Sequence, residues 1–176
     1  MPVQTLGYLV PQFPGQTHIF FWREIEELEK RGTNVALFST KPPPSSMAPH
    51  GWTDEATART SYLGALRPAA VLHALRHLPL AALWRLWRSG ETGAVKEMVL
   101  MLPAAAALKL ECKARGISHV HAHSCGRSAM IAALAHQMGG PSYSLTLHGP
   151  LQDYGPAQRY KWRKARFATI ASGASS

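Results

Sequence analysis

Three histidines alternate with apolar residues in HVHAHS, residues 119–124, and imidazole can bind metals, donate hydrogen bonds or transfer protons. Successive side chains of a β-strand point to opposite faces, so His119, His121 and His123 would share one face. Three imidazoles on one face could bind zinc or nickel, but zinc ligands usually come from several elements and no carboxylate lies nearby in the sequence. We therefore expect no metal site. His123, at the carboxyl end of the strand, is the candidate catalytic residue with Ser124 beside it, and His119 and His121 are expected to be structural.

A second histidine ends another apolar stretch, SLTLHG, residues 144–149. His148 at such a boundary could hydrogen-bond a ligand oxygen or stabilise a developing charge, and Gly149 would leave room for the ligand. A lone histidine at a strand end is more often a solvated surface residue. Two strands that both end in histidine favour a shared site.

A glycine-containing loop, PQFPGQT, residues 11–17, follows the first apolar run of the chain. Gly15 would let the backbone approach a ligand, and Thr17 could cap the next helix, whose free N–H groups attract phosphate. The alternative is an ordinary strand-to-helix turn, since the chain has neither GxGxxG nor a Walker A pattern.

These candidate residues need a scaffold of alternating strands and helices. Short, mostly apolar runs predict strands at residues 5–10, 34–40, 59–63, 119–123, 143–147 and 167–171. Helices are expected before Gly32, at residues 127–138 and 157–166, and in two stretches, residues 67–90 and 91–116, that Pro79 and Pro103 interrupt. We expect these prolines to kink the helices or divide them into hairpins.

This alternation predicts an α/β fold, a Rossmann-like three-layer domain with a parallel central sheet. One domain would span residues 1–171, with a helical portion at about 67–115, and residues 172–176 would be a tail or the start of a linker. Ligands of such sheets collect outside the carboxyl ends of the strands, which is where the three candidate loops would lie.

The charge of the chain favours anionic partners. Nineteen Lys and Arg against ten Asp and Glu give a net charge of +9, and after Glu111 the only acidic residue is Asp153. The basic run RYKWRKAR, residues 159–166, could contact nucleic acid, but no nucleic-acid fold signature accompanies it, so nucleic acid is not an expected partner. Two cysteines without CxxC spacing and no apolar stretch of ~18 residues predict a cytoplasmic location.

The stretch LPLAALWRLWRSG, residues 78–90, places Trp84 and Trp87 on one helical face with Arg85 and Arg88 close by. Such a helix could lie on an anionic membrane, at the inner face of the cell membrane. It could also pack on the core of its own domain, which is the commoner outcome for such a helix, and the sequence leaves both interpretations open.

Several segments together resemble the N-terminal domain of the retaining glycosyltransferases of family 4, especially bacterial enzymes of exopolysaccharide and colanic-acid type biosynthesis. They are FPGQTHIFFWREIEELEKRG, HVHAHS, AALAHQMGGPSYSLTLHG and ARFATIAS. The resemblance covers most of the chain and is weakest at residues 42–110.

The resemblance implies one half of a GT-B architecture, in which two Rossmann-like domains face each other across a cleft. Gly15 and Gln16 would lie near the donor diphosphate, with Thr17 capping the helix behind them. His123 would lie close to the transferred sugar, and His148 would line the cleft from the neighbouring strand.

The second domain of that family, with its paired glutamates for the nucleotide-sugar, is not found in this sequence. We therefore expect an acceptor-side domain that is inactive by itself, with a saccharide or lipid-linked acceptor, no cofactor, and the nucleotide-sugar as co-substrate of the full enzyme. A dimer could form through the face that the missing domain would cover. The alternative is a non-enzymatic module that binds a membrane or a protein partner.

Overall fold

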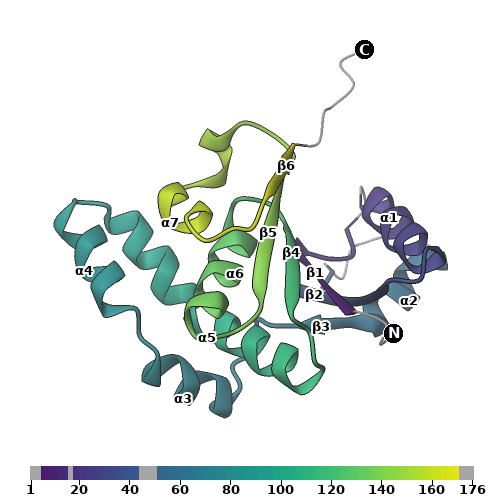
Figure 1. Cartoon of the computed structure of the whole chain (residues 1–176), viewed down its shortest axis with the longest axis horizontal. Helices are drawn as coiled ribbons and strands as arrows, with labels where there is room; N and C mark the ends of the chain where they lie inside the picture. Colours follow the sequence, from purple (N-terminus) through teal and green to yellow (C-terminus); the bar gives the residue numbers. More distant parts are fainter. Residues whose placement is uncertain (1–4, 16–17, 44–50, 171–176) are drawn as a thin grey trace.

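The computed structural model describes residues 5–15, 18–43 and 51–170 and has the predicted α/β architecture. Six parallel strands form one central sheet between layers of helices (Figure 1). The strands are β1 (Thr5–Gln12), β2 (Asn34–Lys41), β3 (Thr60–Tyr62), β4 (His119–His123), β5 (Ser142–Leu147) and β6 (Ala168–Ile170). The helices are α1 (Ile19–Lys30), α2 (Gly51–Arg59), α3 (Pro68–Arg76), α4 (Leu80–Arg88), α5 (Thr92–Ala114), α6 (Arg127–Gln137) and α7 (Gln158–Trp162), with a 3-10 turn η1 (Leu151–Tyr154).

The strand order is β3-β2-β1-β4-β5-β6, which is the order of a Rossmann-type sheet. The chain moves outward from β1 to β3, crosses back to β4 beside β1, and then moves outward the other way. The loops after β1 and β4 therefore lead to helices on opposite faces of the sheet. Ligands of open α/β sheets bind at such a switch point.

The two faces of the sheet are covered differently. On one face α1 and α2 pack over the β1–β2 side through an aromatic cluster that includes Tyr8, Phe21 and Trp22. On the other face α5 and α6 pack over the main core, and α3 and α4 pack on the outside of α5 (Figure 1). No helix among the described residues is long and apolar enough to cross a membrane.

The structure corrects the predicted elements at two points, α2 and α7. Of the two prolines that were expected to kink or divide helices, Pro79 separates α3 from α4, and Pro103 lies inside α5 without ending it. The hydrogen bond lost at Pro103 is offset by the burial of four consecutive alanines, residues 104–107, in the core. Helix α2 was not predicted, because it shows little apolar periodicity, and Arg59 at its end binds Glu29 of α1. Helix α7 is shorter than the predicted helix at residues 157–166.

The turn after β3 has no room for a side chain at Gly64. A Cβ atom there would lie 2.3 Å from the carbonyl oxygen of Thr40, which belongs to the backbone and cannot rotate away. We expect Gly64→Ala to lower the unfolding free energy by roughly 1–3 kcal/mol, measured by urea denaturation. Gly93→Ala in α5 is the control, because its Cβ would meet only Pro156 at 3.9 Å and alanine favours a helix. Equal stability of the two variants would contradict the prediction.

Candidate functional site

The loops at the carboxyl edge of the sheet bring two of the predicted histidines together. His123 ends β4, His148 follows β5, and the centroids of their rings lie 5.8 Å apart. Phe21 of α1 contacts both rings, and its ring centroid lies 4.9 Å from that of His123 and 5.5 Å from that of His148. The site is therefore formed by three segments that are far apart in the sequence.

The His123 side chain is buried, and its ring contacts are aromatic. Only 3% of the residue is exposed, and neither ring nitrogen has a hydrogen-bond partner among the described residues. Its ring packs against Tyr8 at 4.1 Å and His121 at 4.6 Å between centroids. Burial, followed by the charges of His121 and His148, lowers the pKa of His123 to about 2, so the imidazole is neutral at physiological pH.

Neighbouring strands hold His123 in this position. Its backbone pairs with Thr146 of β5, and the preceding Ala122 pairs with Leu9 of β1. Tyr8, whose ring covers the imidazole, donates its hydroxyl hydrogen to Glu24 of α1 at 2.7 Å. A neutral imidazole carries one N–H donor and one acceptor nitrogen, so His123 can both donate to and accept from a ligand hydroxyl.

His119 and His121 are engaged with hydroxyl groups of β5. The two ring nitrogens of His119 lie 2.8 Å from the hydroxyl oxygens of Ser142 and Ser144. Those of His121 lie 2.6 Å from Ser144 and 2.7 Å from Thr146. Within residues 5–15, 18–43 and 51–170, no group of three or more His, Cys, Asp or Glu side chains is arranged to hold a metal.

Ser124 and His148 also have partners within the protein. The Ser124 hydroxyl oxygen accepts the Gly126 N–H at 3.0 Å, which orders the loop before α6. The His148 backbone N–H donates to the Tyr154 hydroxyl at 2.8 Å, while its side chain is exposed beside Phe20. Ser124 therefore shapes the loop, and the exposed His148 imidazole lies against the rings of Phe21 and His123.

Comparison of the chain with protein-family models, curated proteins and solved structures found no match. The site is therefore interpreted from its own geometry.

The remaining predicted residues of the site are only partly placed. Gly15 precedes α1, and its carbonyl oxygen accepts the backbone N–H of His18 at 3.0 Å. Gly149 follows His148, and a Cβ there would meet the Tyr154 hydroxyl at 3.7 Å. Gln16 and Thr17 lie outside the described residues, as do residues 172–176.

The sequence analysis did not predict that Tyr8, Phe21, Glu24 and Tyr154 belong to the site. Tyr8 lies inside a strand that reads as uniformly apolar, and Phe21 lies within the apolar stripe of α1. Glu24 lies one residue before the buried Ile25, which places it at the edge of the packed face. In the sequence, this position of Glu24 indicates that its carboxylate could approach the site.

The tryptophans of α4 do not pack in the core. Trp84 is 55% exposed and Trp87 is 59% exposed, and their rings contact each other at 5.2 Å. The helix packs on α5 through Ala82, which is buried, with Leu83 and Leu86 partly buried against the core. Arg85 and Arg88 are exposed on the same helix.

Proposed function

We propose that the chain is the N-terminal, acceptor-side domain of a retaining family 4 glycosyltransferase of bacterial polysaccharide biosynthesis. The complete GT-B enzyme would transfer a sugar from a nucleotide-sugar to a saccharide or lipid-linked acceptor, without a metal or an organic cofactor. A separate donor-binding domain would hold the nucleotide-sugar, so the chain alone would be inactive. The proposal places the enzyme in the cytoplasm, at the inner face of the cell membrane.

The observation that supports this proposal most strongly is the pair of unpaired ring nitrogens of His123. Each buried polar atom without a partner costs about 1–3 kcal/mol. A ligand hydroxyl could restore the lost hydrogen bonds. A sugar suits the site because its hydroxyls both donate and accept, which matches a neutral imidazole.

The other candidate residues would have the following roles. His148 and Gly149 would line the acceptor side of the cleft, and Ser124 would hold the loop that begins α6. Gly15, Gln16 and Thr17 would lie on the donor side, where the free N–H groups at a helix start attract a diphosphate. Because His123 is neutral, it would orient the sugar by hydrogen bonds, while the donor phosphates would stabilise the positive charge that develops during transfer.

Ligand-detected NMR tests this proposal with a water-soluble prenyl-diphosphate saccharide as the acceptor analogue, and with UDP-glucose and GDP-mannose as donors. We expect the wild-type chain to bind the acceptor analogue and not the donors. His123→Phe keeps a flat aromatic ring, larger than imidazole, and removes both nitrogens. We expect it to bind at least roughly tenfold more weakly, since about 1.4 kcal/mol is lost with a single hydrogen bond.

The control is His77→Phe, which removes an exposed imidazole at the end of α3 and should bind as the wild type does. Tight binding of a nucleotide-sugar by this chain alone would show that the domain is the donor side. Absence of all binding, or equal binding by His123→Phe, would overturn the proposal in favour of a non-enzymatic module.

A further inference from the structure

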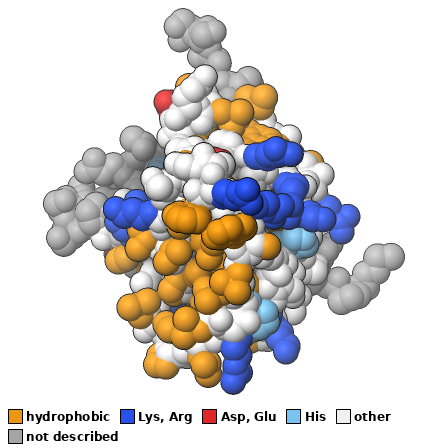
Figure 2. Space-filling view, turned by 90° about the vertical axis from the view of Figure 1, so that its left-hand side faces the viewer, with side chains coloured by type: hydrophobic (Ala, Val, Ile, Leu, Met, Phe, Trp, Pro, Cys, Tyr) orange, Lys and Arg blue, Asp and Glu red, His pale blue; other side chains and the backbone are white. Residues whose placement is uncertain are grey.

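The face formed by α3 and α4 exposes many large apolar side chains. Figure 2 views the molecule from this side and shows an apolar area with Lys and Arg side chains above and below it. At least 38% of each of these residues on α3, on α4 and between them is exposed: Leu72, Leu75, Leu78, Leu80, Trp84 and Trp87. We call this set the α3–α4 surface. Soluble domains rarely leave such a contiguous apolar area without a partner.

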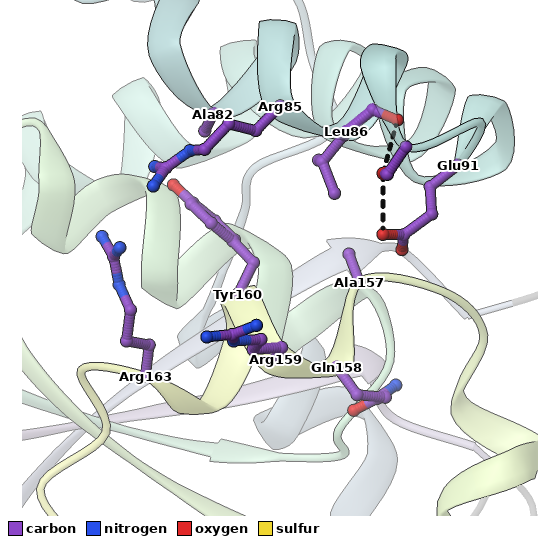
Figure 3. A pocket seen from close by; sticks show the side chains of 10 residues that line it. Ala82, Arg85, Leu86, Glu91, Ala157, Gln158, Arg159, Tyr160 and Arg163 are labelled. Atoms are coloured by element: carbon purple, nitrogen blue, oxygen red, sulfur yellow. Dashed lines mark hydrogen bonds between the residues drawn. The ribbon is translucent and has the colours of Figure 1, made fainter.

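A cavity of about 410 Å³ lies between α4 and α7, next to the α3–α4 surface. Three arginines line it, Arg85 from α4 and Arg159 and Arg163 from α7 and its end, together with Tyr160. Figure 3 shows the side chains of Arg85, Arg163 and Tyr160 gathered at one end of the cavity. Arginine guanidinium groups bind phosphate oxygens through paired hydrogen bonds, so this end suits a phosphate group.

The charge of this cavity is not neutralised within the described part of the chain. The ion pairs among the described residues involve other basic side chains. None of the three arginines therefore has a described carboxylate within 4.0 Å. The one acidic residue of the cavity lining, Glu91, lies at the opposite end, where its carboxylate oxygen is 3.1 Å from the Ser89 hydroxyl (Figure 3). The cavity therefore keeps an uncompensated positive charge beside an exposed apolar surface.

We infer that the α3–α4 surface docks on an anionic phospholipid bilayer and that a lipid phosphate enters the arginine-lined cavity. Trp84 and Trp87 would insert among the headgroups, because indole combines an apolar ring with a polar N–H and is favoured at that depth. Arg85 and Arg88 would bind the phosphates around them, since basic residues near an anionic surface are attracted to it.

A bilayer fits this face better than a second copy of the chain does. The chain carries a net charge of +9, and a symmetric dimer through this face would bring the same arginines toward each other. An anionic bilayer supplies both an apolar layer for the tryptophans and the opposite charge for the arginines. This inference specifies the membrane location proposed above, but its test measures vesicle binding and not sugar binding, so either proposal can fail alone.

Vesicle co-sedimentation tests the inference with phosphatidylcholine vesicles and with vesicles that also contain phosphatidylglycerol. We expect binding only to the second kind, and quenching of tryptophan fluorescence by brominated lipid. The variant Trp84→Ser with Trp87→Ser should abolish the quenching and weaken binding by roughly tenfold or more. The variant Arg85→Gln with Arg163→Gln should weaken it by roughly thirtyfold, since each basic residue contributes about a fivefold effect.

The matched control is Lys30→Gln with Arg31→Gln, which removes two charges at the end of α1, on the other face of the sheet. This variant should bind vesicles within roughly twofold of the wild type, because its charges lie away from the docking face. Equal weakening by both charge variants would mean diffuse attraction and would overturn the inferred site. Absence of vesicle binding, or a dimer in solution that the tryptophan variant dissociates, would also overturn it.

A phosphate competition measurement separates a headgroup in a bilayer from a free phosphate. If inorganic phosphate saturates the cavity and the chain does not bind anionic vesicles, the cavity binds a soluble anion and the bilayer inference is wrong. If vesicle binding survives phosphate at physiological concentration and depends on Arg85 and Arg163, the bilayer is the ligand.

Discussion

Replacing Glu97 by glutamine should lower the unfolding free energy by about 3–5 kcal/mol, because it leaves a buried lysine without its partner. Lys161 of α7 has no exposed surface, and its ammonium group lies 2.9 Å from a carboxylate oxygen of Glu97 on α5. The same ammonium group donates to the carbonyl oxygen of Tyr154 at 3.1 Å. Urea denaturation at neutral pH measures the loss.

Two further variants decide whether the effect comes from the buried charge. Glu97→Leu combined with Lys161→Met removes both charges and should cost much less than Glu97→Gln alone, since no ion is left unpaired. Glu111→Gln removes the carboxylate of a partly exposed pair with Arg67 and should cost less than about 1 kcal/mol. A loss below that value for Glu97→Gln would mean that water reaches Lys161 and that the pair is not stabilising.

This ion pair also matters for the cavity between α4 and α7. Lys161 lies between Arg159 and Arg163 in the sequence, so the contact that holds α7 on α5 also fixes the two arginines that line the cavity. Loss of vesicle binding in Glu97→Gln would therefore be expected as a secondary effect. For that reason the docking test uses arginine and tryptophan variants that leave the pair intact.

The sequence was sufficient to predict the sheet, because most parallel strands that are covered on both faces are short apolar runs bounded by glycine or proline. It was insufficient for α2, which has little apolar periodicity and is held by the contact of Arg59 with Glu29 and Trp22. At Pro103 it left a kink and a division both open, and there the burial of the following alanines keeps α5 continuous. In both cases a tertiary contact decided the local structure.

The candidate site could be predicted only at the histidines, because each of them interrupts or ends a run of apolar residues. His123 and His148 end strands, and strand ends gather at one edge of a parallel sheet, so their proximity could be expected. The burial of Lys161 could not be predicted, since a lysine in a basic run is normally solvated. Similarly, the contact of Tyr8 with His123 depends on the pairing of β1 with β4, which are far apart in the sequence.

Acidification should destabilise the protein well before its carboxylates are protonated. Burial and the neighbouring histidines lower the pKa of His121 to about 4 and that of His123 to about 2. In the unfolded chain both would titrate near 6.5, so below that pH the unfolded state binds protons that the native state does not. The unfolding free energy is therefore highest above about pH 6.5, and it falls as the pH decreases toward the pKa values of the native state.

The expected loss is about 1.4 kcal/mol per pH unit for each histidine, or roughly 5 kcal/mol for the pair between about pH 6.5 and about pH 4.5. That is comparable with the total stability of many domains, so the urea midpoint should fall steeply over this range. Of the other groups near the two rings, the Tyr8 hydroxyl is neutral throughout. Burial also lowers the pKa of His119 and of His148, so both add to the loss in the same direction.

The variant His123→Phe separates the contribution of this histidine from that of His121. It should remove the part of the pH dependence that comes from His123, because phenylalanine binds no proton, while His121, His119 and His148 keep their parts. At neutral pH it should be at least as stable as the wild type, since two buried nitrogens without partners are removed and the aromatic contacts with Tyr8 and Phe21 can remain. If His123→Phe were less stable at neutral pH by more than the roughly 1–3 kcal/mol that overpacking by the larger phenyl ring can cost, the imidazole would have a structural role, and its nitrogens would no longer point to a ligand.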